Sequence, residues 1–289
     1  MIGIEREKVG ALPVWAWAAL SGFAIWLLYV ITLGPTTAFW DTSEYIATAH
    51  ILGVPHPPGN PLFVIVGKAW LLLTAWTGLE VAMRINLLSA TVSAGAAVFW
   101  FLAVMRIWAH FTENRAVALM AAFCAVLVGG TAYTVWAQSN VNEKVYTVSL
   151  LFVAAISYLA MLWEDHSDTY RGDRIIVLIA FLLGLGATNH QMSLLPLPAL
   201  AVFVLWHNHG RLLSWKALAI VAGGLVAGVA LGAALQGVGW PLPRLWLFAG
   251  AISLVAVVLS PRVAVAGTVF LLVGFSVQLL FVPIRSALN

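Results

Sequence analysis

Two carboxylates three positions apart, Asp41 and Glu44, are the side chains of this chain best suited to chemistry. They begin a stretch of helical character, and residues i, i+3 and i+4 of a helix are neighbours, so both would share one side with Tyr45. A carboxylate near a low-dielectric boundary can accept a proton or bind a metal ion. The same spacing fits a capping box, in which Asp41 would only stabilise the start of the helix. Both interpretations are open at this stage.

Two short helices joined by a rigid turn are expected to position these carboxylates. The first follows Asp41 and runs to about Leu52, because a glycine and a proline then interrupt it. The turn is the His-Pro-Pro-Gly sequence at residues 56–59, in which proline fixes φ and glycine permits a tight reversal. The second helix, about residues 62–76, is apolar apart from Lys68 and is expected to lie along a membrane surface.

The composition indicates what surrounds these elements. Hydrophobic residues make up 62% of the chain and charged residues 9%, against about a quarter charged in soluble domains. Since a spanning helix needs about 20 apolar residues, residues 1–289 are expected to form one all-α integral membrane domain with about nine transmembrane helices. The predicted spans are residues 11–33, 83–108, 116–136, 145–163, 174–190, 192–207, 217–235, 244–260 and 263–281. Glycines inside them favour close helix packing.

The positive charges favour a cytoplasmic N-terminus. Of 14 lysines and arginines, nine then fall on the cytoplasmic side and five outside, in agreement with the positive-inside rule. The first apolar segment is longer than the apolar core of a signal peptide and is expected to remain as an anchor. Residues 34–80 become a long external stretch, and external acids are scarce: Asp41, Glu44, Glu80 and Glu143.

Several function classes lack the motifs they require. The basic residues are scattered rather than clustered with aromatics, which disfavours a nucleic-acid partner. The chain has no phosphate-binding P-loop, no H-E-x-x-H helix and no G-x-S-x-G elbow. No His, Cys, Asp and Glu spacing by itself predicts a metal site. The single cysteine, Cys124, excludes a disulfide within the chain.

A set of motifs extends along the chain. The most specific is Phe-Trp-Asp-Thr-Ser-Glu-Tyr-Ile-Ala at residues 39–47, followed by His-Pro-Pro-Gly-Asn-Pro-Leu at 56–62 and Gly-Lys at 67–68. Residues 142–150, 184–190 and 282–289 agree with the same pattern. Together they resemble a bacterial family of multi-pass proteins, formerly of unknown function, that is related to an animal protein O-mannosyltransferase and belongs with the C-type glycosyltransferases. The resemblance covers nearly the whole chain.

The resemblance implies a fold and a reaction. C-type enzymes have two membrane-surface helices and an acidic residue in the first external loop, and they take a sugar from a polyprenyl-phosphate carrier. Asp41 falls at the acidic position, with Glu44 as its companion, so Asp41 is the candidate base for an inverting transfer of a mannose-like sugar to a hydroxyl. The implied partners are the lipid-linked donor, membrane lipids and an acceptor protein or glycan. The implied compartment is the bacterial plasma membrane, with the reaction on its external face.

The substrate-binding candidates lie in the matching motifs on the external side. They are His56, Lys68, Glu143, Lys144, His190 and Arg285. Cations would stabilise the departing lipid phosphate, although Lys144 and Arg285 also suit contact with anionic head groups, and His190 also suits a helix end. A divalent cation held by Asp41 and Glu143 is a further inference from the resemblance.

Two other classes of function stay open. One is a membrane transporter, although its ionisable residues would be expected inside the spans rather than at their ends. The other is a noncatalytic membrane subunit or a truncated remnant of the same fold. This alternative arises because longer relatives continue beyond the Arg-x-x-x-Asn motif at residues 285–289.

Overall fold

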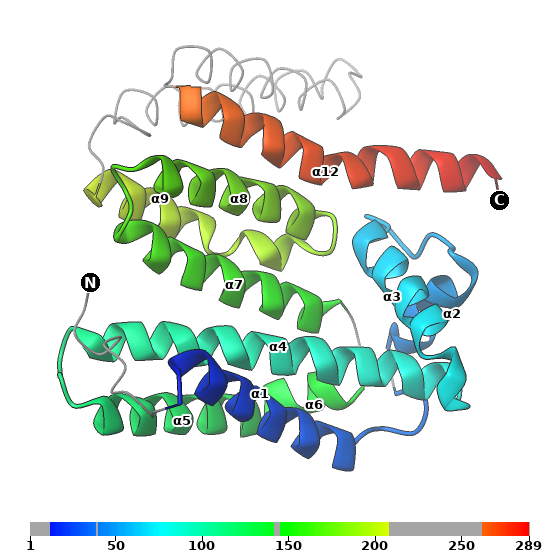
Figure 1. The fold of residues 1–289 in the computed structure, drawn as a ribbon. Helices are drawn as coiled ribbons and strands as arrows, with labels where there is room; N and C mark the ends of the chain where they lie inside the picture. The colour runs from blue at the N-terminus through cyan, green and yellow to red at the C-terminus, as the bar shows by residue number, and fades with distance from the viewer. Residues whose placement is uncertain (1–11, 39, 142–144, 208–261, 289) are drawn as a thin grey trace, which may run out of the picture.

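The chain folds into helices and their connections. The computed structural model describes residues 12–38, 40–141, 145–207 and 262–288, and within these ranges it contains no strand (Figure 1). The elements are α1 (Val14–Ile31), α2 (Thr42–Ile51), α3 (Pro61–Leu73), η2 (Ala75–Thr77), α4 (Val81–Ala109), α5 (Arg115–Thr131), α6 (Tyr133–Asn140), α7 (Tyr146–Glu164), α8 (Tyr170–Ala187), η3 (Gln191–Leu194), α9 (Leu197–His207) and α12 (Arg262–Leu288). The predicted all-α class is confirmed for this part of the chain.

Four helices are long and apolar enough to cross a membrane: α1, α4, α7 and the Val269–Leu288 part of α12. They match four predicted spans and support a multi-pass membrane protein. The predicted span 116–136 is instead divided into α5 and α6, which meet at an angle of 65°. The break follows two consecutive glycines, 129 and 130, which weaken a helix.

The other predicted spans have different outcomes. Residues 174–190 correspond to α8, which has the length of α1 but not its apolarity, and residues 192–207 correspond to η3 with α9, which do not reach the length of a full span. α8 begins with three charged residues near its first turn, and η3 and α9 are short. The segments 217–235 and 244–260 lie outside the described residues, so the total of nine spans stays a prediction.

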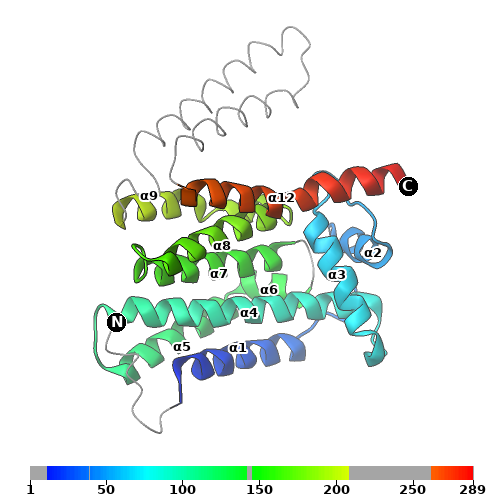
Figure 2. The ribbon, with the colours of Figure 1, turned by 45° about the horizontal axis from the view of Figure 1, so that its top comes forward.

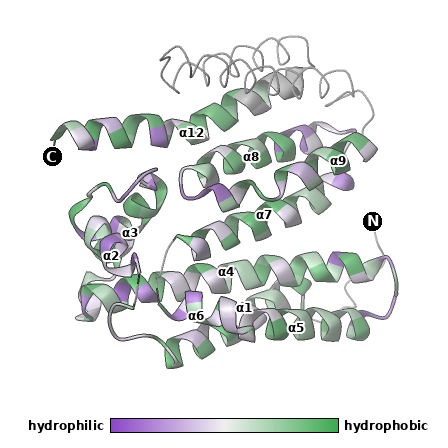
Figure 3. Ribbon diagram, turned by 180° about the vertical axis from the view of Figure 1, so that it is seen from behind, coloured by the Kyte–Doolittle hydropathy of each residue, from purple (hydrophilic) through white to green (hydrophobic). Residues whose placement is uncertain are grey.

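The long helices form an apolar bundle around α4. In Figures 1 and 2, α1 and α5 lie on one side of α4, α7 and α8 lie on the other, and α12 packs on α8. Buried small and aromatic residues such as Ala18, Ala97 and Phe101 fill the space between α1, α4 and α5. The long helices carry mostly hydrophobic residues (Figure 3), and large side chains such as Phe23 and Leu127 are exposed, as expected of surfaces that face lipid.

The hairpin of α2 and α3 lies across one end of this bundle (Figure 1). Apolar residues on its inner side, including Tyr45, Ala49 and Phe63, are buried against Ile85 of α4 and Val148 of α7. The expected bounds of both short helices are confirmed, with α3 extended by the 3-10 turn η2. The stretch of residues 34–80 that was predicted to be external therefore contains an ordered platform, α2 and α3, on the end of the bundle.

A buried polar junction connects the platform to the bundle. Asn60, 1% exposed, accepts a hydrogen bond from Tyr45 Oη at 2.9 Å and donates through Nδ2 to the carbonyl of Asn189. Asn189 Nδ2 in turn donates to Val145 O and Ser149 Oγ, both at 2.9 Å. Because a buried polar group without a partner is costly, this chain of bonds determines how α3 meets α7 and α8.

The last described helix also holds the platform. Gln278 of α12 donates to Pro58 O in the turn, and Arg285 Nε donates to Leu52 O at 2.8 Å. Gly59 has a φ of 92°, and a Cβ at this position would lie 2.9 Å from Val282 Cγ2. The glycine therefore permits both the reversal of the turn and its contact with α12.

Two glycines allow α8 and α12 to approach each other closely. A methyl group at Gly184 would overlap the carbonyl of Leu271, and one at Gly274 would lie 2.5 Å from Phe181 O. Backbone meets backbone at both points, so no flexible side chain can move aside. This contact is the small-residue packing that the glycines in the apolar segments predict.

We expect Gly184→Ala to destabilise the protein by about 1–3 kcal/mol, because the added methyl forces the two helix backbones apart. Gly129→Ala is the matched control, since a Cβ at this helical glycine meets nothing within 4 Å. Thermal unfolding of the full chain in detergent measures both. Equal melting temperatures for the two variants would show that α8 and α12 do not pack as described.

Asn60→Asp should destabilise the protein by about 1–3 kcal/mol or more, because it removes the Nδ2 donor and places a carboxylate beside the Asn189 carbonyl. Asn114→Asp is the control: Asn114 caps α5 by accepting from Ala116 N and Val117 N, and aspartate caps equally well. Denaturation of both variants in the same detergent tests the junction. A loss no larger for Asn60→Asp than for the control would contradict it.

Candidate functional site

Asp41 stands at the start of α2 without capping it. Its carbonyl accepts the backbone N–H of Tyr45 at 3.1 Å, but its carboxylate makes no capping bond to the helix. Glu44 does not complete a capping box either, because both of its oxygens are engaged by His56. Of the two interpretations of the Asp41 and Glu44 spacing, the structure therefore supports the one in which these carboxylates have other partners.

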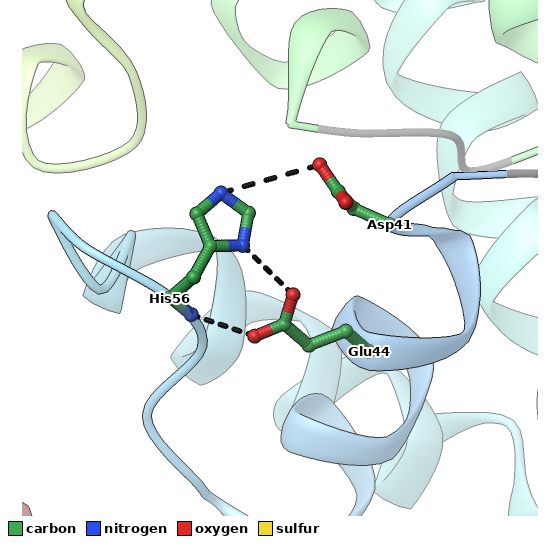
Figure 4. Close-up of side chains that lie close together, drawn as sticks. All are labelled: Asp41, Glu44 and His56. Carbon is green, nitrogen blue, oxygen red and sulfur yellow. Dashed lines mark hydrogen bonds and ion pairs between the residues drawn. The ribbon is translucent and has the colours of Figure 1, made fainter.

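Glu44 binds His56 at two points. Its Oε1 accepts the His56 backbone N–H at 2.6 Å, and its Oε2 lies 2.7 Å from the ring Nδ1 (Figure 4). An ionised carboxylate only accepts hydrogen bonds, so Nδ1 carries the proton. The ring orientation is thereby determined, and its other nitrogen, Nε2, points toward Asp41.

Asp41, Glu44 and His56 form one cluster. His56 Nε2 lies 4.0 Å from Asp41 Oδ2, and one ligand atom from each of the three residues falls within 4.8 Å of the others. The side chains of Asp41, Glu44 and His56 are 34%, 37% and 46% exposed, so a substrate can reach them. The cluster can accept a proton, orient a hydroxyl or hold a metal ion.

Tyr45 supports this cluster from beneath. Its side chain is buried, its ring contacts the His56 ring edge-on at 5.8 Å between centroids, and its hydroxyl donates to Asn60. Burial raises the pKa of Tyr45, and the neighbouring Glu44, Asp41 and Tyr146 raise it further. The phenol therefore stays protonated and keeps its bond to Asn60. Helical spacing places Tyr45 beside the acids, but its burial could not be read from that spacing.

Trp40, directly before Asp41, was not singled out by its position in the sequence. Its backbone has a φ of 66°, in the left-handed region that bulky residues seldom adopt, and its side chain is 79% exposed. Strained backbone of this kind is concentrated at functional sites. The strained residue lies directly before the candidate base, so its backbone conformation sets the orientation of Asp41.

Lys68 and Arg285 both contact the C-terminal end of α2. Lys68 Nζ donates to His50 O at 2.6 Å, and Arg285 reaches the next turn at Leu52. Lys68 is thus part of the platform that carries the acidic cluster, Arg285 of α12 lies against it, and each binds a backbone carbonyl.

His190 lies where α8 gives way to η3. Its Nδ1 accepts the Met192 backbone N–H at 3.2 Å, and its ring contacts Tyr146 edge-on at 5.3 Å between centroids. Tyr146 contacts His190 and is close enough to Tyr45 to raise its pKa. Tyr146 was not predicted as a site residue. Glu143 and Lys144, which precede it, lie outside the described residues. The structure therefore brings Asp41, Glu44 and His56 into contact. It also places Lys68, His190 and Arg285 at the same end of the bundle, through the contacts of Lys68 and Arg285 with the end of α2 and of Asn189 with Asn60.

Comparison with known proteins gives a consistent family. Residues 41–213 match the family model described as the protein O-mannosyl-transferase TMEM260 N-terminal domain. The match begins at Asp41 and includes all of α2 to α9. No solved structure matches the chain.

Two curated relatives carry the same name. The chain is 31% identical to mouse protein O-mannosyl-transferase TMEM260 over 216 residues, which is 73% of this chain and 28% of the relative. It is 27% identical to Dictyostelium discoideum protein O-mannosyl-transferase tmem260 over 190 residues, which is 62% of this chain and 22% of the relative. The aligned part spans about a quarter of the length of these relatives. Through the match over residues 41–213, the chain belongs to the family of the TMEM260 N-terminal domain.

Proposed function

We propose that this chain is a membrane glycosyltransferase that moves a mannose-like sugar from a polyprenyl-phosphate carrier to a hydroxyl of an acceptor protein or glycan. Membership of the family and the names of the two relatives support transfer of mannose to protein. The bundle of apolar helices supports a donor that is itself held in lipid.

The cluster of Asp41, Glu44 and His56 is the observation that carries the proposal. It unites two carboxylates and an imidazole at the end of an otherwise apolar bundle, within reach of solvent. An acceptor hydroxyl is a poor nucleophile, and a carboxylate beside it can take its proton as it attacks. Asp41 is the proposed base because its carboxylate is accessible and does not cap α2.

The reaction is a direct displacement at the anomeric carbon. The bond from the acceptor oxygen to that carbon forms while the bond to the phosphate oxygen breaks, so the configuration inverts. The proton passes to Asp41, and the lipid phosphate leaves with the electron pair. Glu44 acts through His56, whose ring it orients toward the reacting groups.

The remaining candidates are proposed to bind the donor phosphate or its carrier. Lys68, His190 and Arg285 lie at the same end of the bundle as the cluster, although each already has a protein partner. Lys144 and Glu143 complete the proposed set on sequence grounds. Cations around a leaving phosphate lower the barrier because negative charge develops there.

The proposal extends to fold and location. We propose a C-type glycosyltransferase fold with about nine spans, in a bacterial plasma membrane with the N-terminus in the cytoplasm. In support, the cluster and the connections at residues 110–114 and 165–169 lie at opposite ends of the bundle (Figure 1). The α2 and α3 platform then lies on the external face.

Asp41→Asn should reduce sugar transfer by at least about 100-fold, because it keeps the size of the side chain and removes the base. The assay measures transfer of labelled mannose from polyprenyl-phosphate donors to an envelope acceptor extract, in membranes with equal amounts of folded full-length chain. Asp168→Asn, in the connection before α8 at the opposite end, is the control and should retain full activity. Transfer by Asp41→Asn at the control rate would remove Asp41 from the role of base.

Cysteines at Thr37 and Asp168, both exposed, should react with a membrane-impermeant thiol reagent from opposite faces of the membrane. The background is Cys124→Ala, since Cys124 is also exposed. Labelling in intact cells should modify the cysteine at position 37, and the one at position 168 should require permeabilisation. Modification of both positions in intact cells would disprove the topology.

A further inference from the structure

A cavity of about 250 Å³ lies inside the bundle, along one face of α4. All of its lining residues come from α1, α4, α5, α6 and α7. The cluster of Asp41, Glu44 and His56 belongs to α2, its first flanking residue and the turn that follows, so the cavity is a separate feature of the molecule.

Small residues at successive helical turns produce this cavity. On α4 its lining residues begin at Ser93 and continue three, four, seven and eleven positions later, which is one face of a helix. Three of them, Ser93, Ala96 and Ala97, have short side chains. On α5 the facing positions include Ala125 and Gly129, and a Cβ at Gly129 would meet nothing within 4 Å. The cavity therefore follows from the sequence, as side-chain volume that both helices lack at the same level.

The cavity lies at the depth of the lipid hydrocarbon. From Ser93 to Val104 the axis of α4 rises about 16 Å, which is about half of the hydrocarbon thickness of a bilayer. Ser93 in turn is about 18 Å along the helix from Val81, at the platform end. The head group of a lipid stays at the membrane surface, so only its hydrocarbon chain can reach this level.

The lining favours a hydrocarbon ligand over a polar one. Its polar groups already have protein partners: Tyr29 Oη donates to Gly130 O at 2.7 Å, and Ser93 Oγ lies 2.9 Å from Ser139 Oγ. Apolar cavities exclude water and bind apolar molecules, and a cavity of about 150 Å³ already accommodates benzene. A larger cavity that extends along a helix suits a longer hydrocarbon.

A lipid chain can enter this cavity from the bilayer. Ala125 and Gly129 are both exposed, and their neighbours Leu127 and Val128 on α5 are 58% and 70% exposed. Exposed apolar side chains on a spanning bundle face lipid. α5 and α7 lie on opposite sides of α4 (Figures 1 and 2), and Leu150 of α7 also lines the cavity. A chain bound there contacts all three helices.

We propose that the cavity binds one acyl chain of a bilayer phospholipid, which becomes part of the packing between α4, α5 and α7. Phospholipid is the most abundant chain-bearing molecule around the bundle, so mass action favours it over rarer lipids. The bound chain supplies the dispersion contacts that the short side chains of α4 and α5 do not make. The proposal is independent of the proposed sugar transfer.

The test uses phosphatidylcholine with brominated acyl chains, because bromine quenches tryptophan fluorescence on contact. The purified full chain in detergent is titrated with this lipid. Trp100 lines the cavity, and its signal is the difference between each chain and the same chain with Trp100→Phe. We expect saturable quenching of Trp100 in the native chain.

Gly129→Leu should bind the lipid at least about 10-fold more weakly, because the leucine takes the place of two or more methylene groups of the chain. Cys124→Leu is the matched control. It adds a leucine at an exposed position of α5 that does not line the cavity, so it should bind the lipid as the native chain does. Ala125→Leu replaces Gly129→Leu if size-exclusion profiles show that the latter does not fold.

The inference is overturned if Trp100 is not quenched, or if the variant that fills the cavity is quenched as strongly as Cys124→Leu. Competition with unbrominated lipids identifies the source of the chain. Recovery of Trp100 fluorescence at a much lower concentration of polyprenyl phosphate than of phosphatidylcholine would assign the cavity to an isoprenoid chain and overturn the phospholipid. No arm requires sugar transfer, so neither result decides the proposed function.

Discussion

The side chain of Asn60 is the interaction on which the rest of the site depends. It sits between the α2 and α3 platform and the bundle, and it satisfies Tyr45 and the Asn189 carbonyl together. The Asn189 carbonyl is buried and cannot form a hydrogen bond with water instead, so loss of the bond from Asn60 would destabilise the fold. Through Tyr45 it also supports the ring of His56. The accessible cluster therefore rests on a buried, hydrogen-bonded layer beneath it.

The cluster joins requirements that usually conflict. In the proposed reaction its carboxylates must be open to a substrate, yet their directions must be set closely. The two acids have different roles. Glu44 holds His56 in place with both of its oxygens, and Asp41 has an accessible carboxylate. The strained backbone at Trp40 and the turn with Gly59 contribute in the same way, since each directs a neighbour rather than contacting a substrate.

Local features could be predicted from the sequence, and long-range ones could not. The ends of α2 and α3 and the turn between them depend on nearby proline, glycine and apolar spacing, so their prediction was confirmed. The contact of Glu44 with His56 spans 12 positions and that of Asn60 with Asn189 spans 129, and no local pattern encodes either. Hydropathy likewise missed the bend between α5 and α6, because a sliding window averages over a break of a single residue. The family motif made Asp41 and Glu44 the candidate site residues, but their different partners appeared only in three dimensions.

The hydrogen bonds from α12 to the platform have a consequence for biogenesis. Gln278 meets the turn across 220 positions of sequence, and Arg285 meets the end of α2 across 233. A ribosome releases these residues long after α2 and α3 have left the translocon. Until α12 inserts, the turn that carries His56 lacks its outer support, so the cluster matures late during synthesis. Nascent chains that stall before α12 would then lack the contacts of Gln278 and Arg285 with the platform.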